Sequence, residues 1–351
     1  MKPTLALSAF LLSLAIAQEG TSWEFKLLPD LGVSLTRSFS ERTEVALLST
    51  KQWLDGVEQD ETQFELEIKN TREASMTDLV LETEGGQIAR LARSFPSIFA
   101  KTLTSGQVGE YVLGPWVGEG SSELVGAEVL LGWNDEEECA VTYSEDFVDY
   151  DPVLLKGLTE TGSLAGLLPD EKVSMGDKWG VDPEVLVGII QPGGDLGQRL
   201  DQPEKPTNRP AIALSYFFSL AECGSELGGD VELEFQGIKS SEDGDVASFS
   251  IVAEFTSTRD VLEAMSKIAE GMGSRVSSEV MGTLEETILD YSFAGVGELL
   301  WDVDGGYARF FELSGQLEVL SKATYRKEGV AQEQERTFAG TTRLTVETER
   351  D

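Results

Sequence analysis

Residues 231–255 read VELEFQGIKSSEDGDVASFSIVAEF, and this stretch decides the fold class. Before its Asp243-Gly244 dipeptide, Val231, Leu233 and Phe235 alternate with polar residues. After the dipeptide, apolar residues again occupy every second position from 247 to 255. Such alternation is typical of strands with one buried face, and Asp-Gly between two such runs is a strong hairpin signal. The stretch therefore predicts an antiparallel β-hairpin.

The same alternation continues toward the C-terminus. Further runs lie at 289–293, 298–303, 307–313, 317–325 and 338–346. A second Asp-Gly pair, Asp304-Gly305, separates two of these runs and predicts a second hairpin. We expect a meander of about seven strands with one apolar face.

An amphipathic segment near 260–281 interrupts this meander. Leu262, Met265, Ile268 and Met272 recur at helical spacing and form one apolar stripe. The stripe predicts a helix that packs on the sheet as ordinary core. The alternative is that these four side chains face an apolar ligand, since methionine adapts to ligands of varied shape.

The N-terminal half contains a similar mixture. Strand-like runs precede and follow a helical stretch near 87–103, with Pro96 as a break. Its apolar face is formed by Ile88, Leu91, Phe95, Ile98 and Phe99. Together, the two halves predict an α+β fold. It consists of long, curved antiparallel β-meanders with one or two amphipathic helices packed on one face.

The predicted organisation has three parts. Residues 1–17 resemble a signal peptide, with Lys2, an apolar run and a small-residue cleavage site, Ala15-Ile16-Ala17. An N-terminal β-rich half would follow at 18–165 and a C-terminal β-meander half at 166–351. The short match of LLPDLGVSL at 27–35 with LLPDEKVSM at 167–175 leaves two similar halves and coincidence as open alternatives. We expect an exported protein, periplasmic or extracellular, with no membrane span after cleavage.

The composition excludes several classes of function. The 351 residues include 63 acidic and 27 basic side chains and no histidine, for a formal net charge of -36. Without histidine, Ser-His-Asp sites and imidazole-dependent zinc sites cannot form. The acidic excess makes nucleic acid an unfavourable partner. We expect no cofactor, and the chain is more plausible as a non-enzyme.

One motif carries a family resemblance. The segment LPDEKVSMGDKW, from Leu168 to Trp179, resembles the LPxxxVxxGDxW signature of exported bacterial proteins of uncharacterised function. The resemblance covers about a dozen residues and implies export and a β-rich architecture, but no catalytic residues. Taken as local structure, Gly176-Asp177 predicts a turn and Trp179 an apolar anchor behind it.

Carboxylate chemistry is the main catalytic option that remains. Residues 302–306, DVDGG, begin like a calcium-binding EF-hand loop, but Tyr307 and Leu313 stand where the loop needs Gly and Glu. The leading hypothesis is an exported, non-catalytic cell-envelope protein, either structural or a carrier of an apolar small molecule or lipid. The alternative is a carboxylate-dependent hydrolase acting on extracellular polysaccharide.

The two cysteines, Cys139 and Cys223, are the final candidates. Export would place them in an oxidising compartment, where a single pair can persist as a disulfide. The alternative is two small buried side chains that never meet. We expect the disulfide, which would link the two halves.

Overall fold

The structure is a computed structural model, and its described part forms one large antiparallel sheet. The described residues are 22–27, 31–59, 64–84, 87–108, 110–133, 139–159, 164–194, 196, 199–200, 216–241, 244–264 and 283–350. The strands are β1 (Ser34–Leu54), β2 (Val57–Glu58), β3 (Phe64–Glu84), β4 (Gln87–Val108), β5 (Tyr111–Ser121), β6 (Glu128–Trp133), β7 (Cys139–Tyr143), β8 (Lys178–Val181), β9 (Arg199–Leu200), β10 (Gly228–Ser241), β11 (Gly244–Asp260), β12 (Thr283–Asp302), β13 (Tyr307–Lys327) and β14 (Val330–Arg350).

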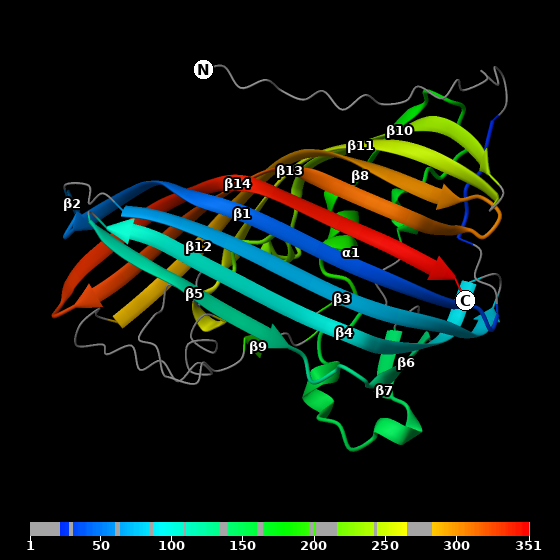
Figure 1. Ribbon diagram of the computed structural model, residues 1–351, viewed down its shortest axis with the longest axis horizontal. Coiled ribbons are helices and arrows are strands. Elements are labelled where there is room, and N and C mark those ends of the chain that lie inside the picture. The colour runs from blue at the N-terminus through cyan, green and yellow to red at the C-terminus, as the bar shows by residue number, and fades with distance from the viewer. Residues whose placement is uncertain are drawn as a thin grey trace.

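The strand order is β7-β6-β4-β3-β1-β14-β13-β12-β11-β10-β8, with β2, β5 and β9 paired at the sides (Figure 1). β1 and β14 pair along almost their whole length, from Leu35 opposite Arg350 to Leu54 opposite Gln332. This central pair joins strands from the first part of the chain to strands from the last part. Both parts therefore contribute to one continuous, strongly curved sheet.

The two predicted hairpins are confirmed. β10 and β11 meet at Ser241 and Gly244, and β12 and β13 meet at Asp302 and Tyr307. In the second turn, Asp302 Oδ1 accepts a hydrogen bond of 2.6 Å from the Gly305 amide. Its other oxygen, Oδ2, lies 2.6 Å from Arg309 Nη2. The Asp302 carboxylate thus stabilises the turn through this hydrogen bond and this ion pair, as the hairpin interpretation predicts.

The predicted α+β class is wrong, because the described chain is mostly strand. The helix expected near 87–103 is part of strand β4. At Pro96 the register between β3 and β4 shifts, and this bulge places two β4 residues opposite one β3 residue. Buried side chains therefore fall at Leu91 and Phe95 before the bulge and at Ile98 after it. The change of phase produces a spacing of three that imitates a helix.

The second expected helix lies mainly outside the described residues. β11 ends at Asp260, whose Oδ1 accepts a hydrogen bond of 2.9 Å from the Leu262 amide. Residues 262–264 are helical. Met265, Ile268 and Met272 fall in the undescribed segment 265–282.

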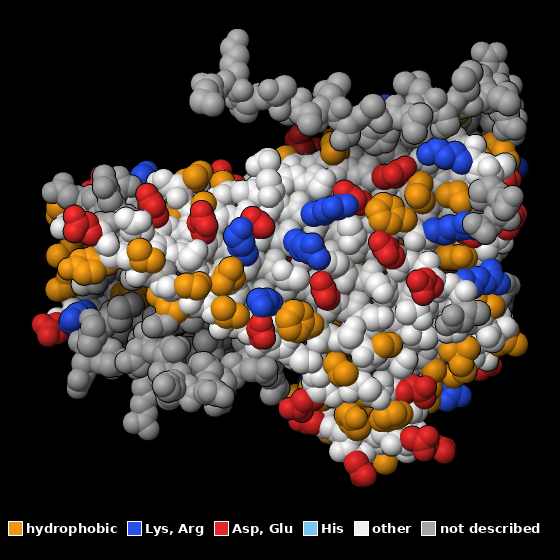
Figure 2. Space-filling view, in the orientation of Figure 1, with side chains coloured by type: hydrophobic (Ala, Val, Ile, Leu, Met, Phe, Trp, Pro, Cys, Tyr) orange, Lys and Arg blue, Asp and Glu red, His pale blue; other side chains and the backbone are white. Residues whose placement is uncertain are grey.

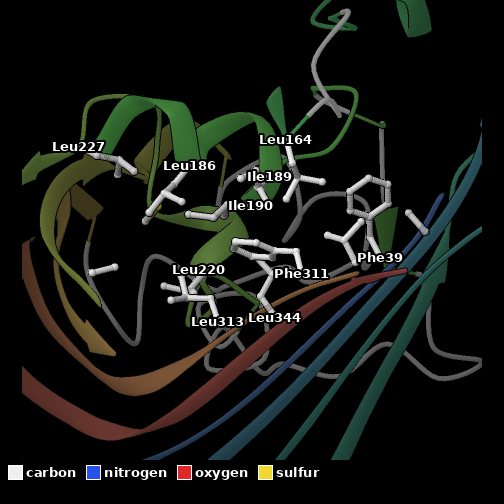
Figure 3. Packing of buried hydrophobic residues seen from close by; sticks show 14 of the residues in the cluster. Phe39, Leu164, Leu186, Ile189, Ile190, Leu220, Leu227, Phe311, Leu313 and Leu344 are labelled. Carbon is white, nitrogen blue, oxygen red and sulfur yellow. The ribbon is translucent and has the colours of Figure 1, made fainter. Parts of the chain in front are cut away.

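Short helical elements lie in the connections between strands, and most of them contribute buried side chains to the core on the inner, concave face of the sheet. They are α1 (Val187–Ile190) and the 3₁₀ turns η1 (Glu145–Phe147), η2 (Pro152–Leu155), η3 (Ala165–Leu167), η4 (Pro183–Leu186) and η5 (Leu220–Glu222). Figure 3 shows Leu186, Ile189 and Ile190 above the sheet residues Leu313 and Leu344, all buried. The hydrophobic core thus lies between the curved sheet and its own irregular connections.

Basic and acidic side chains are interspersed on the outer face of the sheet (Figure 2). Three ion pairs join neighbouring strands, Lys69–Glu44, Arg343–Glu312 and Lys322–Asp290, with N–O distances of 2.9, 2.6 and 2.8 Å. Cross-strand pairs of this kind help to fix strand register, although exposed pairs contribute little free energy.

Candidate functional site

The candidate site is built around residues 216–223, YFFSLAEC, which we call the inner segment. This segment forms no strand and lies against the inner face of the sheet, with η5 at its end. All its residues except Ala221 are buried. The ring of Phe218 packs on that of Phe338 of β14, with centroids 4.4 Å apart. The segment thus occupies the inner face near the centre of the sheet.

Two polar side chains of the sheet bind carbonyl groups of the inner segment. Asn70 on β3 donates from Nδ2 to the Phe218 carbonyl, and Tyr291 on β12 donates its hydroxyl to the Phe217 carbonyl, both at 2.8 Å. Asn70 is itself oriented by Thr102 on β4, whose hydroxyl donates to Asn70 Oδ1 at 2.6 Å. Strands on both sides of the central pair therefore hold the same short piece of backbone.

Glu41 on β1 binds amide groups of the inner segment. Its Oε1 accepts from the Leu220 amide at 2.6 Å, and its Oε2 accepts from the Ala221 amide at 3.2 Å. The hydroxyl of Thr43 adds a third hydrogen bond to Oε1 at 2.9 Å. The carboxylate thereby satisfies free N–H groups at the start of η5, as an N-cap side chain does in a helix. Burial raises the pKa of Glu41, against the opposing effect of Arg72 and these hydrogen bonds.

Glu222 lies between two arginines of the sheet. Its Oε1 is 2.7 Å from Arg72 Nη2 on β3, and its Oε2 is 2.6 Å from Arg259 Nη1 on β11. The Arg72 guanidinium also stacks over the Tyr216 ring at 4.2 Å. With Glu41, the four charged groups are two acids and two bases, so their formal charges cancel. This balance matters because an uncompensated buried charge is strongly destabilising.

The end of the inner segment is held in the same way. Ser257 on β11 donates its hydroxyl to the Cys223 carbonyl, and Gln191 donates from Nε2 to the Ala221 carbonyl at 2.7 Å. Burial, then the charges of Glu41 and Glu222, raise the pKa of the Cys223 thiol to about 12. Cys223 is therefore a neutral thiol near pH 7 and not an activated nucleophile.

A second buried charged cluster lies elsewhere on the inner face. Asp78 on β3 accepts from Arg93 Nε on β4 at 2.7 Å and from Arg37 Nη1 on β1 at 2.6 Å. Arg93 also donates from Nη1 to the Thr159 carbonyl at 2.9 Å. Burial raises the pKa of Asp78, but the charges and hydrogen bonds of Arg93 and Arg37 outweigh burial and lower it. This cluster ties the connection after β7 to the sheet.

The structure places the sequence-derived candidates apart from this network, with one exception. Cys223 ends the inner segment, whereas Cys139 begins β7 at one end of the strand order, and the structure forms no disulfide between them. The expected bridge is thus not formed. In the helix candidate, Leu262 is half-buried and follows β11, while Met265, Ile268 and Met272 lie outside the described residues.

The LPxxxVxxGDxW segment has the structural role expected of it. Asp177 Oδ2 accepts from the Ser174 amide at 2.7 Å, and Gly176 adopts a φ of 90°, as the predicted turn requires. Trp179 on β8 donates from Nε1 to the Leu167 carbonyl at 3.0 Å, and its ring meets Phe249 edge-on. The motif therefore closes one side of the sheet over the core.

The sequence analysis missed Glu41, Asn70, Arg72 and Arg259, although each stands in the apolar phase of its strand. Glu41 stands in the same strand phase as Phe39 and Val45, which are buried. A charged residue in the apolar phase of a strand requires a buried partner. The partners themselves could not be found, since the inner segment is remote in sequence.

The described residues contain no cluster suited to a metal ion and no helix suited to span a membrane. No group of three or more Cys, Asp or Glu side chains in them is arranged to hold a metal ion. No helix in the described ranges combines the length and apolar character needed to cross a membrane.

Comparisons with known proteins assign no family. No family model matches the chain, and no curated protein matches it. Among solved structures, an outer membrane channel from Pseudomonas putida F1 aligns at 7% identity and a TM-score of 0.23, over 93% of this chain and 98% of that one. A beta-barrel-like protein of a domain of unknown function from Brucella abortus aligns at 10% identity and a TM-score of 0.13, over 88% and 97%. Such low TM-scores do not establish a shared fold.

Proposed function

We propose that this chain is an exported, non-catalytic binding protein of the cell envelope, and that the inner face of its sheet binds an apolar ligand. The observation that carries the proposal is the inner segment. A curved sheet holds a non-strand element among aromatic rings and buried polar groups, and this internal contact supports the binding of apolar groups by the same face. The export part rests on the signal-peptide pattern of residues 1–17.

The lining of the inner face suits an apolar ligand. Five consecutive strands of the order, β10 to β14, each contribute a buried phenylalanine: Phe235, Phe249, Phe293, Phe311 and Phe338. Aromatic side chains bury large apolar areas and dominate the energetics of binding sites.

The chemistry of the buried groups supports binding rather than catalysis. Glu41 and Glu222 accept hydrogen bonds or ion pairs from named partners, and the raised pKa of Cys223 keeps its thiol protonated. General acid–base work needs a group whose pKa lies near the working pH and which can reach substrate. These groups are instead engaged with the inner segment.

An apolar fluorescent probe tests the proposal. N-phenyl-1-naphthylamine titrated into the folded chain should bind saturably, with about one probe per chain. Met265→Asp lies in the stripe that the sequence analysis offers as ligand-facing. If that stripe contacts the probe, this change should weaken binding by at least about tenfold, which corresponds to about 1.4 kcal/mol. The matched control is Val296→Asp on β12, where Val296 is 61% exposed. Absence of saturable binding by the unmodified chain would overturn the proposal.

A further inference from the structure

The sheet recognises the inner segment mainly through its backbone. Side chains from outside the segment bind the backbone of seven of its eight residues, all except Ser219. Two of these hydrogen bonds come from arginines. Arg72 donates to the Tyr216 carbonyl at 3.4 Å, and Arg259 donates to the Glu222 carbonyl at 2.9 Å. Peptide-binding proteins use the same division, in which backbone hydrogen bonds provide affinity and side-chain pockets provide selectivity.

The inner segment is also independent of the strand ladder. Its backbone hydrogen bonds to itself are local, such as the Cys223 amide to the Leu220 carbonyl at 2.9 Å, and no strand pairing involves residues 216–223. Its departure would therefore leave every ladder pair in place. The segment is therefore a separate unit that can open without unfolding the sheet, at the expense of its buried apolar contacts and side-chain hydrogen bonds.

The fit of the inner segment is incomplete. The hydroxyl of Ser219 is buried and has no hydrogen-bond partner in the described structure. On β12 of the sheet, the hydroxyl of Thr287 is also buried and has no hydrogen-bond partner in the described structure. Buried polar atoms of this kind favour release of the segment or its replacement by a better-fitting occupant.

We propose that the inner face is a peptide-binding site, and that the inner segment is an intramolecular ligand that competes with a second polypeptide. This rests on the proposed function and specifies its apolar ligand. The partner is an extended chain with two consecutive bulky apolar residues, which take the places of Phe217 and Phe218. Backbone binding at seven positions favours a peptide over a lipid, because an acyl chain offers none of these amide and carbonyl groups.

Charge adds a selectivity rule. When the inner segment leaves, Glu222 leaves with it, and Glu41, Arg72 and Arg259 remain on the sheet. Their formal charges sum to +1 (2 − 1), although the whole chain carries -36. The partner therefore needs an acidic residue four positions after its second apolar residue, as Glu222 follows Phe218.

A labelled peptide tests the proposal directly. The peptide YFFSLAES, which copies 216–223 with serine in place of cysteine, carries fluorescein and is titrated into the full chain while anisotropy is recorded. Phe218→Ala weakens the internal competitor and should increase affinity for the peptide by about tenfold or more over the unmodified chain. Phe147→Ala, an aromatic truncation in η1 outside the inner segment, should leave affinity unchanged.

Two peptide controls examine the recognition. Replacing the glutamate of the peptide by glutamine should weaken binding by roughly tenfold, since the two arginines lose their acidic partner. A scrambled peptide of the same composition should not bind. If folded Phe218→Ala binds no peptide, or binds the scrambled one equally well, the proposal is overturned.

Hydrogen exchange on the unmodified chain decides the case in which Phe218→Ala does not fold. The amides of Leu220 and Ala221 should exchange at least about tenfold faster than ladder amides of β12, because the segment opens without the sheet. Exchange at the same rate as the ladder would show a permanent core element and overturn the proposal. Binding of the apolar probe without binding of the peptide would overturn this inference alone and leave the proposed function standing.

Discussion

Glu41 is a buried carboxylate that accepts hydrogen bonds from two backbone amides of the inner segment. We predict that Glu41→Ala lowers the free energy of unfolding by about 2–4 kcal/mol, because both amides lose their acceptor and Arg72 loses a nearby opposite charge. Urea denaturation measures this. The matched control is Glu44→Ala on the same strand, where the exposed carboxylate pairs with Lys69, and its effect should be much smaller.

The pH dependence of Glu41 has a defined sign. Because burial raises its pKa above the usual 4.5, the folded state binds this proton more tightly than the unfolded chain. The resulting stabilisation is complete below pH about 4.5 and is lost as pH rises through the folded-state pKa. Relative to the unmodified chain, Glu41→Gln should therefore gain stability as pH rises from about 4 to 8. A constant difference across this range would contradict the prediction.

Asp78 behaves in the opposite way. Its pKa is lowered from 3.8 by Arg93 and Arg37 against the effect of burial, so its stabilisation is present above pH about 3.8 and lost as pH falls. Asp78→Asn should cost about 3–5 kcal/mol at pH 7, since two buried arginines lose their counter-ion. Thermal or urea unfolding checks this against Glu82→Gln, an exposed acid on the same strand. Equal effects would show that the cluster is not coupled to stability.

Among the elements, the long strands depend on glycines at close approaches. Gly315 on β13 lies opposite Gly295 on β12, and a Cβ at Gly315 would overlap the carbonyl oxygen of Ala294. We predict that Gly315→Ala costs about 2–4 kcal/mol, because the two strands must separate locally. Gly132→Ala on β6 is the control, since its Cβ would meet nothing within 4 Å. Unfolding curves in urea that show equal losses would contradict this explanation.

Strand β4 shows why the sequence analysis predicted a helix near 87–103 where the structure has a strand. Its bulge beside Pro96 changes the inward phase of the strand, so that Phe95 and Ile98 are both buried at a spacing of three. Period analysis assumes an uninterrupted strand, and one extra residue imitates helical spacing. The hairpin of β12 and β13 also contains a register shift, between Leu300 and Trp301. Its prediction was confirmed all the same, because the Asp304-Gly305 pair marks the turn independently of strand phase.

For the whole molecule, the acidic excess has a measurable consequence. A formal charge of -36 makes the compact state repel itself, and salt screens that repulsion. We predict that the melting temperature rises by about 1–2 °C between low and moderate salt, the shift expected from roughly 1 kcal/mol in a chain of 351 residues. Differential scanning calorimetry in sodium chloride measures it. An unchanged melting temperature would show that the charges are too dispersed to affect stability.

Antiparallel strands, the two Asp-Gly hairpins and the turn before Trp179 follow from local sequence alone. Alternation and turn chemistry are properties of neighbouring residues, so each is readable without knowledge of the rest of the chain. The meeting of Glu41 with Leu220, 179 positions apart, was decided only by the tertiary structure. The pairing of β1 with β14 joins the first and last parts of the chain in one sheet and so brings remote side chains onto one inner face. Local periodicity contains no information about such contacts, because it records which side of a strand is buried and not what lies against it.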